Sequence, residues 1–312
     1  MAKFRMNHAR QGKGGLPKIQ PLLALIAIVG AFVWGATALP DLLKVENTTP
    51  AATTIPFPEK DVQNHAEEEV FFLPKTDVDQ VIHHQHYSLG YVEQHELAAW
   101  VAYELTREQL KMERVKRADL FQPDAKVATT SAQLNDYRGS GYDRGHLIPA
   151  ADRAFSTAAM QETFLMSNVA PQVHTFNGGI WRELEELVRD WAYKYKKVYV
   201  VTGPLLTKPP LKKIGQNKVS VPTAFYKVIL DISEPELKGI GFIIPNETSN
   251  QRLQQYAMSI DEVEKQTGID FFADLMDETL AQKIESQVDI SLWHFDEKKY
   301  ELRINRWNNY TQ

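Results

Sequence analysis

The amino-acid sequence predicts an α+β fold, a mixed α/β domain in which strands and helices follow no regular order. Runs of β-branched and apolar residues at 196–206, 219–232 and 237–246 are typical of buried strands. Apolar residues at helical spacing occur at 177–195 and from about 259 to 268. Because these segments do not alternate as βαβ units, we expect α+β rather than a doubly wound parallel sheet.

Composition sets limits on the protein's class. The 312 residues are 43% hydrophobic and 24% charged, which is typical of one large or two small globular domains. The chain has no cysteine, so disulfides, cysteine-based zinc sites and a thiol nucleophile are excluded. The formal net charge of −5 shows that any nucleic-acid surface must be a local patch.

The N-terminus predicts membrane attachment. Residues 1–20 contain five Lys or Arg and no acid, and residues 21–40 contain no charge. An apolar helix of about 20 residues spans a bilayer, and the basic flank favours a cytoplasmic N-terminus. We expect one transmembrane helix at 21–40 ahead of the domain. The alternative is a signal peptide cleaved near Ala36-Thr37-Ala38. The remainder is then extracytoplasmic (periplasmic or extracellular), either membrane-anchored or secreted.

Residues 41–85 are rich in Thr, Pro and Glu and are predicted to be a linker, followed by a domain at 86–312. Within that domain, residues 96–105 form a strand or a short helix. The clearest helix, 177–195, has Asn177 as its predicted N-cap. Its packed face carries an apolar stripe: Ile180, Leu184, Leu187, Val188 and Trp191. A shorter helix opens at Ser259 or Asp261 and ends at Gly268.

Basic residues are concentrated in two segments. Residues 193–218 contain seven lysines and no acid, and residues 107–126 contain six basic residues against four acids. Residues 258–301 are acidic by contrast. A locally basic face is what binding to a phosphate backbone requires, although solvated surface lysines are the alternative.

Residues 143–146, Asp-Arg-Gly-His, contain the first candidate chemistry. His146 is suited to general-base work because its ordinary pKa lies near neutrality. Arg144 lies on the same face of a strand and would bind phosphate through its planar fork, whereas Asp143 faces the other way and is expected to hold the loop. Asn177 and Glu185 follow on the predicted helix, and their oxygens suit Mg²⁺. The alternative makes Asn177 only a cap and Glu185 a solvated residue.

Five motifs taken together carry a family resemblance. They are SGYDRGHLIPAAD, FLMSNVAPQ, FNGGIWRELE, VYVVTGP and VPTAFYKVI, in that order along the chain. Over residues 87–295 the sequence resembles the DNA/RNA non-specific endonucleases, which include bacterial extracellular nucleases and mitochondrial endonuclease G. This resemblance implies a nuclease domain built on a ββα-metal (His-Me finger) core.

The resemblance also implies site roles. His146 matches the general base, and Asn177 the single protein ligand of a Mg²⁺ ion, for which Mn²⁺ is an alternative. Glu185 matches the acid that holds the metal's waters, and Arg144 the arginine that stabilises the phosphate. Asn168 matches the asparagine that assists at the scissile group. Arg117 is the candidate for an upstream substrate arginine, with Arg114 as the alternative.

These roles predict Mg²⁺-dependent, sequence-nonspecific hydrolysis of DNA and RNA that leaves 5′-phosphate and 3′-hydroxyl ends. The rival hypotheses are a catalytically silent, membrane-anchored nucleic-acid-binding module and a membrane-anchored scaffold. A homodimer is left open.

Other polar and aromatic residues are weaker candidates for functional sites. The histidines of residues 83–86, HHQH, lack a nearby carboxylate motif, so a solvated loop is favoured over a metal site. His174 has no assigned role. Trp181 and Trp191 are expected in the core. Ser140 lacks the G-x-S-x-G context of a serine hydrolase.

Overall fold

The computed structural model describes residues 72–117, 119–207 and 211–309. All of them belong to the compact unit Glu59–Gln312. The predicted basic segment 1–20 and transmembrane segment 21–40 lie outside the described residues. Within the ranges that the structure describes, no helix has the length and hydropathy needed to cross a bilayer.

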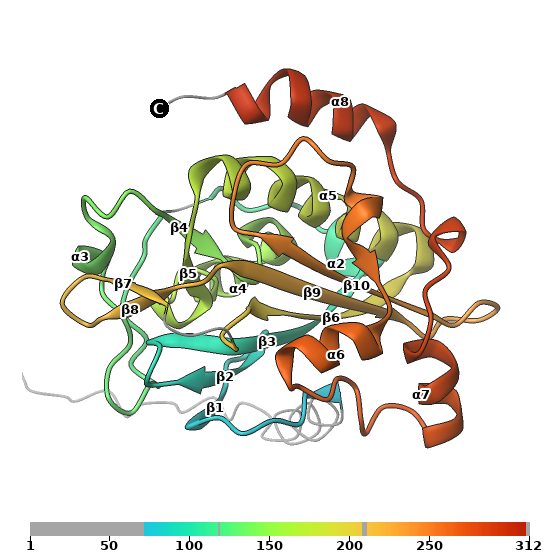
Figure 1. Ribbon diagram of the computed structural model, residues 1–312, viewed down its shortest axis with the longest axis horizontal. Helices are drawn as coiled ribbons and strands as arrows, with labels where there is room; N and C mark the ends of the chain where they lie inside the picture. The colour runs from blue at the N-terminus through green and yellow to red at the C-terminus, as the bar shows by residue number, and fades with distance from the viewer. Residues whose placement is uncertain (1–71, 118, 208–210, 310–312) are drawn as a thin grey trace, which may run out of the picture. The chain divides into compact units, whose positions relative to one another are not determined.

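A seven-stranded sheet forms the centre of the fold (Figure 1). Every neighbouring pair of strands in it is antiparallel. In spatial order the strands are β1 (Gln80–His83), β2 (Ser88–Val92), β3 (Leu97–Thr106), β6 (Lys197–Pro204), β9 (Ala224–Asp231), β10 (Lys238–Pro245) and β11 (Ala257–Met258). The α+β prediction is confirmed, because antiparallel strands need no helical crossovers.

Two small ladders and several helices complete the unit. The ladders pair β4 (Asp143–His146) with β5 (Val169–Gln172), and β7 (Lys212–Ile214) with β8 (Val219–Val221). The α-helices are α2 (Arg107–Lys111), α3 (Leu134–Tyr137), α4 (Thr157–Glu162), α5 (Arg182–Tyr195), α6 (Ile260–Thr267), α7 (Glu278–Glu285) and α8 (Glu297–Asn305). A π-helical turn, Phe176–Trp181, precedes α5, and 3₁₀ turns lie at Ala150–Arg153, Met166–Asn168, Leu253–Tyr256, Ile290–Leu292 and Trp307–Asn309.

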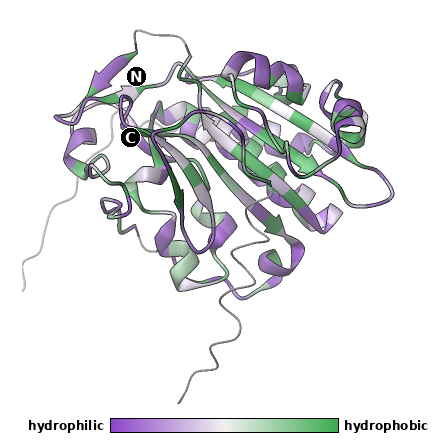
Figure 2. Ribbon diagram, turned by 90° about the horizontal axis from the view of Figure 1, so that it is seen from below, coloured by the Kyte–Doolittle hydropathy of each residue, from purple (hydrophilic) through white to green (hydrophobic). Residues whose placement is uncertain are grey.

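Helices cover both faces of the sheet. The buried stripe of α5 packs with residues such as Val200 and Ile229 on one face. On the other face, α6 and α7 pack over Val201 and Val228. Side chains alternate between the two faces of a strand, so each central strand contributes side chains to the hydrophobic core on both faces of the sheet. Figure 2 shows the resulting hydrophobic strands between helices whose outer residues are hydrophilic.

Most predicted elements are confirmed. The segments 196–206 and 237–246 correspond to β6 and β10, and 96–105 is the strand β3. The segment 219–232 contains two strands, β8 and β9, because Pro222 between them has no N–H to donate to a ladder. Helix α6 begins after Ser259, whose side chain accepts from the N–H of Glu262, and ends at Gly268 with a φ of 73°.

The predicted linker at 41–85 is wrong in its C-terminal part. Strand β1 pairs with β2, and the N–H of Lys75 donates to the carbonyl of Asp270 over 2.8 Å. Ile82 is buried whereas Val81 is 45% exposed. The strand is only four residues long, begins and ends with a polar residue and lies at the edge of the sheet, so its composition resembles that of a linker.

Candidate active site

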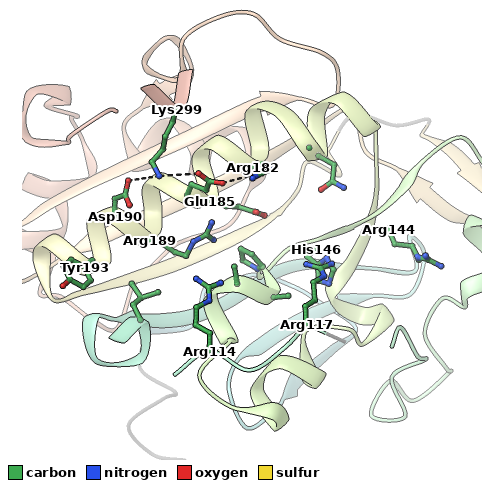
Figure 3. Close-up of a pocket in the computed structure, with 17 residues that line it drawn as sticks. Arg114, Arg117, Arg144, His146, Arg182, Glu185, Arg189, Asp190, Tyr193 and Lys299 are labelled. Carbon is green, nitrogen blue, oxygen red and sulfur yellow. Dashed lines mark hydrogen bonds and ion pairs between the residues drawn. The ribbon is translucent and has the colours of Figure 1, made fainter. Parts of the chain in front are cut away.

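A cleft of about 730 Å³ lies between α5 and the segment that follows α2, with β4 at one end (Figure 3). Helix α5 forms one wall because it is amphipathic: its apolar stripe is fully buried against the sheet, which leaves the opposite face to line the cleft. That face contributes Arg182, Glu185, Glu186, Arg189, Asp190 and Tyr193. Arg114, Arg117, Arg144, His146, Asn177 and Lys299 line the cleft from other segments.

Five of the six predicted site residues therefore meet in one cleft. His146 and Arg144 come from β4, Asn177 from the π-helical turn, Glu185 from α5, and Arg117 from the segment after α2. Arg114 also lines it, so the alternative upstream arginine is equally well placed.

His146 is held by aromatic packing. Its ring lies 5.3 Å from that of Phe121 and 4.9 Å from that of Phe164, measured between centroids. Its Nε2 atom is buried and has no hydrogen-bond partner among the described residues. Burial, with the charges of Arg117 and Arg144, lowers the pKa of His146 to about 3. The imidazole is therefore neutral at physiological pH.

Asn177 is connected to β4 by a hydrogen bond. Its Nδ2 atom donates to Oδ2 of Asp143 over 2.8 Å, and the same oxygen lies 2.9 Å from Nδ1 of His174. The predicted N-cap role is wrong, because the N–H of Asn177 already donates to the carbonyl of Val173, inside a helical turn. The side chain is thus oriented by Asp143 and not by the helix end.

The residues around Asn177 fit a magnesium ion. With Nδ2 engaged by Asp143, Oδ1 is left without a hydrogen bond from the described residues, and Asn177 lines the cleft. Mg²⁺ keeps several waters and is typically held by few protein oxygens. The described residues contain no group of three His, Asp or Glu side chains placed to ligate a metal. A site with one direct amide ligand and Glu185 nearby matches that donor set.

Glu185 belongs to a charged network beneath the cleft. Burial raises the pKa of Glu185, and the charges of Lys227 and Arg189 oppose that shift. Arg189 donates to Oδ1 of Asp152 over 2.8 Å, while the Tyr103 hydroxyl donates to Oδ2 over 2.9 Å. Asp152 thereby fixes Arg189 on the wall of the cleft.

Lys227 is a site residue that the sequence analysis missed. It is fully buried on the central strand β9, and its Nζ lies 3.5 Å from the carbonyl oxygen of Leu147, the residue after His146. The ammonium also lies 4.7 Å from the ring centroid of Trp181. Burial lowers the pKa of Lys227, and the carboxylate of Glu185 opposes this. A lysine inside the apolar run VPTAFYKVI was the available signal, because a buried lysine needs anionic or carbonyl partners.

The cations of the cleft are placed for phosphate. Arg144 is exposed and stacks over Phe121, with 4.5 Å between its guanidinium carbon and the ring centroid. Arg117 stacks over Phe164 at 5.1 Å and donates to Oδ1 of Asp119 over 2.7 Å. Stacking of this kind fixes the guanidinium plane while leaving its N–H groups available. The predicted basic segment 107–126 thus contributes Arg114 and Arg117 to the cleft.

Asn168 does not reach the cleft, so its predicted role at the scissile group is wrong. The side chain is fully buried. Its Oδ1 accepts from the N–H of Ile148 over 3.0 Å, and its Nδ2 donates to the carbonyls of Ile148 and Thr163. Asn168 therefore fastens the chain just after His146 to the segment before β5. The order of motifs along the sequence could not distinguish this role from a chemical one.

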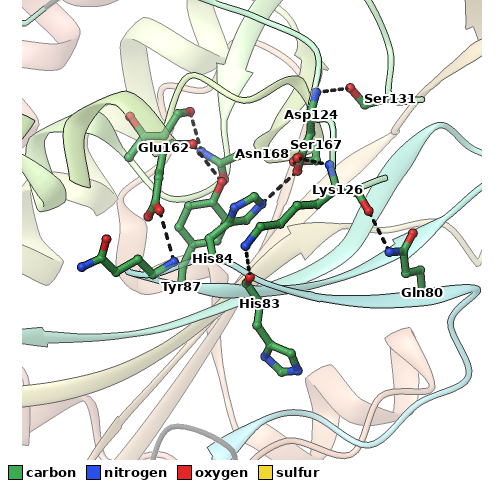
Figure 4. A network of polar contacts seen from close by, with 12 residues as sticks. Gln80, His83, His84, Tyr87, Asp124, Lys126, Ser131, Glu162, Ser167 and Asn168 are labelled. Carbon is green, nitrogen blue, oxygen red and sulfur yellow. Dashed lines mark hydrogen bonds and ion pairs between the residues drawn. The ribbon is translucent and has the colours of Figure 1, made fainter. Parts of the chain in front are cut away.

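The histidines of 83–86 form neither a metal site nor a solvated loop. His84 is buried, and its Nε2 lies 2.9 Å from Oδ2 of Asp124, which also accepts from the Ser167 hydroxyl over 2.6 Å (Figure 4). Nδ1 of His86 lies 2.8 Å from Glu162. His84 and His86 are thus paired with carboxylates distant in sequence, which no local pattern reveals, whereas Nδ1 of His83 lies 2.9 Å from the Ser88 hydroxyl.

Comparisons with known proteins agree with this geometry. The family model of DNA/RNA non-specific endonucleases matches residues 71–278. The mitochondrial nuclease EXOG of Danio rerio is 35% identical over 227 residues, 68% of this chain and 66% of that protein. Human mitochondrial endonuclease G is 36% identical over 192 residues, 57% of this chain and 65% of that protein. A nuclease of Nostoc sp. is 34% identical over 215 residues, 65% of this chain and 76% of that protein.

A solved structure has the same fold. A chain in the crystal structure of the EndoG/EndoGI complex, which concerns the mechanism of EndoG inhibition, superposes with a TM-score of 0.63. It is 34% identical in sequence, and the match covers 68% of this chain and 92% of that one. The sheet and the cleft thus lie within a fold already known among nucleases.

Proposed function

The chain belongs to the DNA/RNA non-specific endonuclease family, and we propose that it hydrolyses phosphodiester bonds of DNA and RNA, without sequence specificity, in a Mg²⁺-dependent reaction. The observation that carries the proposal is the meeting of His146, Asn177, Glu185, Arg144 and Arg117 in one cleft. These residues come from β4, the π-helical turn, α5 and the segment after α2, and they supply a base, a metal ligand, a carboxylate and two phosphate-binding cations.

The chain's own residues account for most of the chemistry. Neutral His146 accepts a proton from the water that attacks phosphorus, while Arg144 and Arg117 bind the non-bridging oxygens on which charge develops. Asn177 would hold Mg²⁺ through Oδ1, and Glu185 would accept hydrogen bonds from its waters. Bound Mg²⁺ supplies Lewis-acid stabilisation of the phosphate and the leaving oxygen. As the P–O3′ bond breaks, the leaving oxygen takes a proton from solvent water, so the products carry 5′-phosphate and 3′-hydroxyl ends.

Supercoiled plasmid provides the test. The full-length chain with Mg²⁺ is expected to nick and then linearise it, and EDTA to stop the reaction. His146→Ala is expected to lower the rate by about 10² to 10⁴-fold, the usual contribution of a general base. His294→Ala, an exposed histidine outside the cleft, serves as the control. Cleavage by His146→Ala at the wild-type rate, or cleavage in EDTA, would refute the mechanism.

The same assay tests the rival hypothesis of a silent binding module and the choice of metal ion. Binding of the plasmid with steep salt dependence and no turnover would establish a silent binding module instead. Replacing Mg²⁺ by Mn²⁺ is expected to support cleavage, because both ions accept oxygen ligands in octahedral geometry.

We also propose that residues 21–40 anchor the chain in the membrane with the nuclease domain on the extracytoplasmic side. The uncharged segment behind a basic flank supports this proposal. Recovery of the protein in the membrane fraction, with the domain accessible to protease added outside, is expected. N-terminal sequencing distinguishes the anchor from a cleaved signal, and light scattering of the purified chain tests for a homodimer.

A further inference from the structure

The cleft extends beyond the residues that the mechanism uses. Tyr193 lines it at the C-terminal end of α5, and Figure 3 places this residue and Arg144 at opposite ends. Tyr193 is 52% exposed, which makes it one of the few large hydrophobic side chains exposed in the described part of the molecule. The ring is therefore not part of the hydrophobic core, and the proposed chemistry does not use it.

Specific contacts with α2 hold Tyr193 and its neighbours in place. Arg107 donates through Nε to the carbonyl of Tyr193 and through Nη2 to that of Lys194, the latter over 2.7 Å. These bonds fasten the start of α2 to the end of α5. The guanidinium carbon of Arg107 lies 5.6 Å from the Tyr193 ring centroid, and Nζ of Lys111 lies 5.9 Å from it. Two cations therefore accompany the ring.

The acids on this wall are already neutralised. Asp190 lies 3.1 Å from Nζ of Lys299, and Glu186 lies within 3.4 Å of Lys299 and 3.0 Å of Arg182. A polyanion that follows α5 from Glu185 to Tyr193 thus meets paired carboxylates. At Tyr193 it meets the ammonium of Lys111 and the guanidinium of Arg107, whose Nε and Nη2 are already bonded to carbonyls of α5.

We propose that Tyr193, with Arg107 and Lys111, forms a subsite that stacks one unpaired nucleobase of a single-stranded substrate and binds its adjoining phosphate. This inference rests on the proposed function. Sequence-tolerant recognition of single strands combines a cationic track with aromatic rings, because every base presents a π-face. A duplex hides the faces of its bases within the stack, so the same ring would contribute little to duplex binding.

The position of Tyr193 on α5 determines how far the proposed subsite lies from the scissile bond. Tyr193 follows Glu185 by eight residues, which is about 12 Å at 1.5 Å per residue. At about 3.4 Å per stacked nucleotide, the stacked base lies within roughly four nucleotides of the scissile bond. Substrates with fewer nucleotides on that side cannot occupy it.

The test measures binding without turnover. Fluorescence anisotropy of labelled oligonucleotides is followed with the full-length chain in EDTA, using a single-stranded 12-mer, a blunt-ended duplex of two annealed strands and a 12-mer of abasic residues. Tyr193→Ala is expected to weaken single-strand binding about tenfold, the loss of one stacked base, and to leave the duplex and abasic strands unchanged. Tyr193→Phe should bind as wild type. Tyr300→Ala, which removes a ring that lies under Arg252 outside the cleft, is the matched control.

Kinetics with Mg²⁺ add a second readout. Tyr193→Ala should raise KM for single strands about tenfold with kcat unchanged, and should leave the plasmid nicking rate unchanged. Unaltered single-strand binding by Tyr193→Ala, or equal losses on single-stranded, duplex and abasic ligands, would overturn the subsite. Since the binding assay needs no cleavage, a wild-type chain that binds through Tyr193 yet never cuts would refute the proposed function alone.

Discussion

The amide of Asn177 donates a 2.8 Å hydrogen bond to the carboxylate of Asp143, so the first residue of β4 orients the residue that faces the cleft from the π-helical turn. Asp143 thus acts through Asn177, and the bond leaves Oδ1 of Asn177, the atom proposed to hold Mg²⁺, without a hydrogen bond from the described residues. Partners of this kind govern metal affinity because they fix the orientation of the liganding atom.

Asp143→Ala is therefore expected to raise the Mg²⁺ concentration at half-maximal plasmid cleavage by about 10- to 100-fold. The rate at saturating Mg²⁺ should fall much less. Asp143→Asn keeps an acceptor oxygen and should lie between wild type and Asp143→Ala. Identical Mg²⁺ dependence in the alanine variant and wild type would show that the hydrogen bond does not orient Asn177.

Substitutions at Asn168 and Arg144 are expected to affect stability and catalysis separately. Asn168→Ala leaves three buried backbone groups unpaired, so the free energy of unfolding is expected to drop by about 3 kcal/mol. Arg144 is exposed, so Arg144→Ala should change that free energy by no more than about 0.5 kcal/mol. Its cleavage rate should nevertheless fall about 100-fold, through lost phosphate stabilisation. Urea denaturation and plasmid nicking measure the two effects, and a stable but inactive Asn168→Ala variant would contradict this division.

Lys227 should control the pH dependence of cleavage. Its buried ammonium opposes the burial-driven rise in the pKa of Glu185. Lys227→Met removes that charge, so the pKa of Glu185 rises further and less of the carboxylate is ionised at pH 7. The acid limb of kcat/KM is expected to move to higher pH.

Lys238→Met provides the matched control, because Lys238 is also buried, beside Asp231 and away from the cleft. It should destabilise the protein without moving the pH profile. An unmoved acid limb in Lys227→Met would mean that the lysine serves packing alone.

A further pH effect concerns stability and lies away from the cleft. Burial and the neighbouring carboxylates of Glu264, Asp261 and Asp270 raise the pKa of Glu285 from 4.5 to about 8. The folded state therefore binds this proton more tightly than the unfolded state. The associated stability is present in full below about pH 4 and is lost as the pH rises through 8.

Glu285→Gln mimics the protonated carboxyl at every pH. It should raise the free energy of unfolding at pH 8.5 by about 1 kcal/mol or more, with little change at pH 4.5. Thermal denaturation across this range measures the effect, with the exposed Glu301→Gln as control. Equal stability of Glu285→Gln and wild type at pH 8.5 would contradict the raised pKa.

Local pattern was sufficient for most of the fold. The strands β6, β9 and β10 and the helices α5 and α6 are confirmed, because alternation and helical spacing of apolar residues are short-range properties that survive packing. The family is confirmed because several motifs occur in a fixed order. The predicted C-terminal boundary of the linker was wrong because strand β1 lies at the edge of the sheet. It pairs only with β2, and composition does not reveal this pairing.

The sequence by itself determined the α+β class, the family, and the candidate residues in and around the Asp-Arg-Gly-His segment. Only the tertiary structure decided which of them share the cleft. It buried Asn168 among backbone groups, placed Lys227 between Leu147 and Glu185, and left Tyr193 open beside Arg107. Burial and electrostatic coupling depend on contacts between residues far apart in the chain, and spacing along the sequence does not encode those distances.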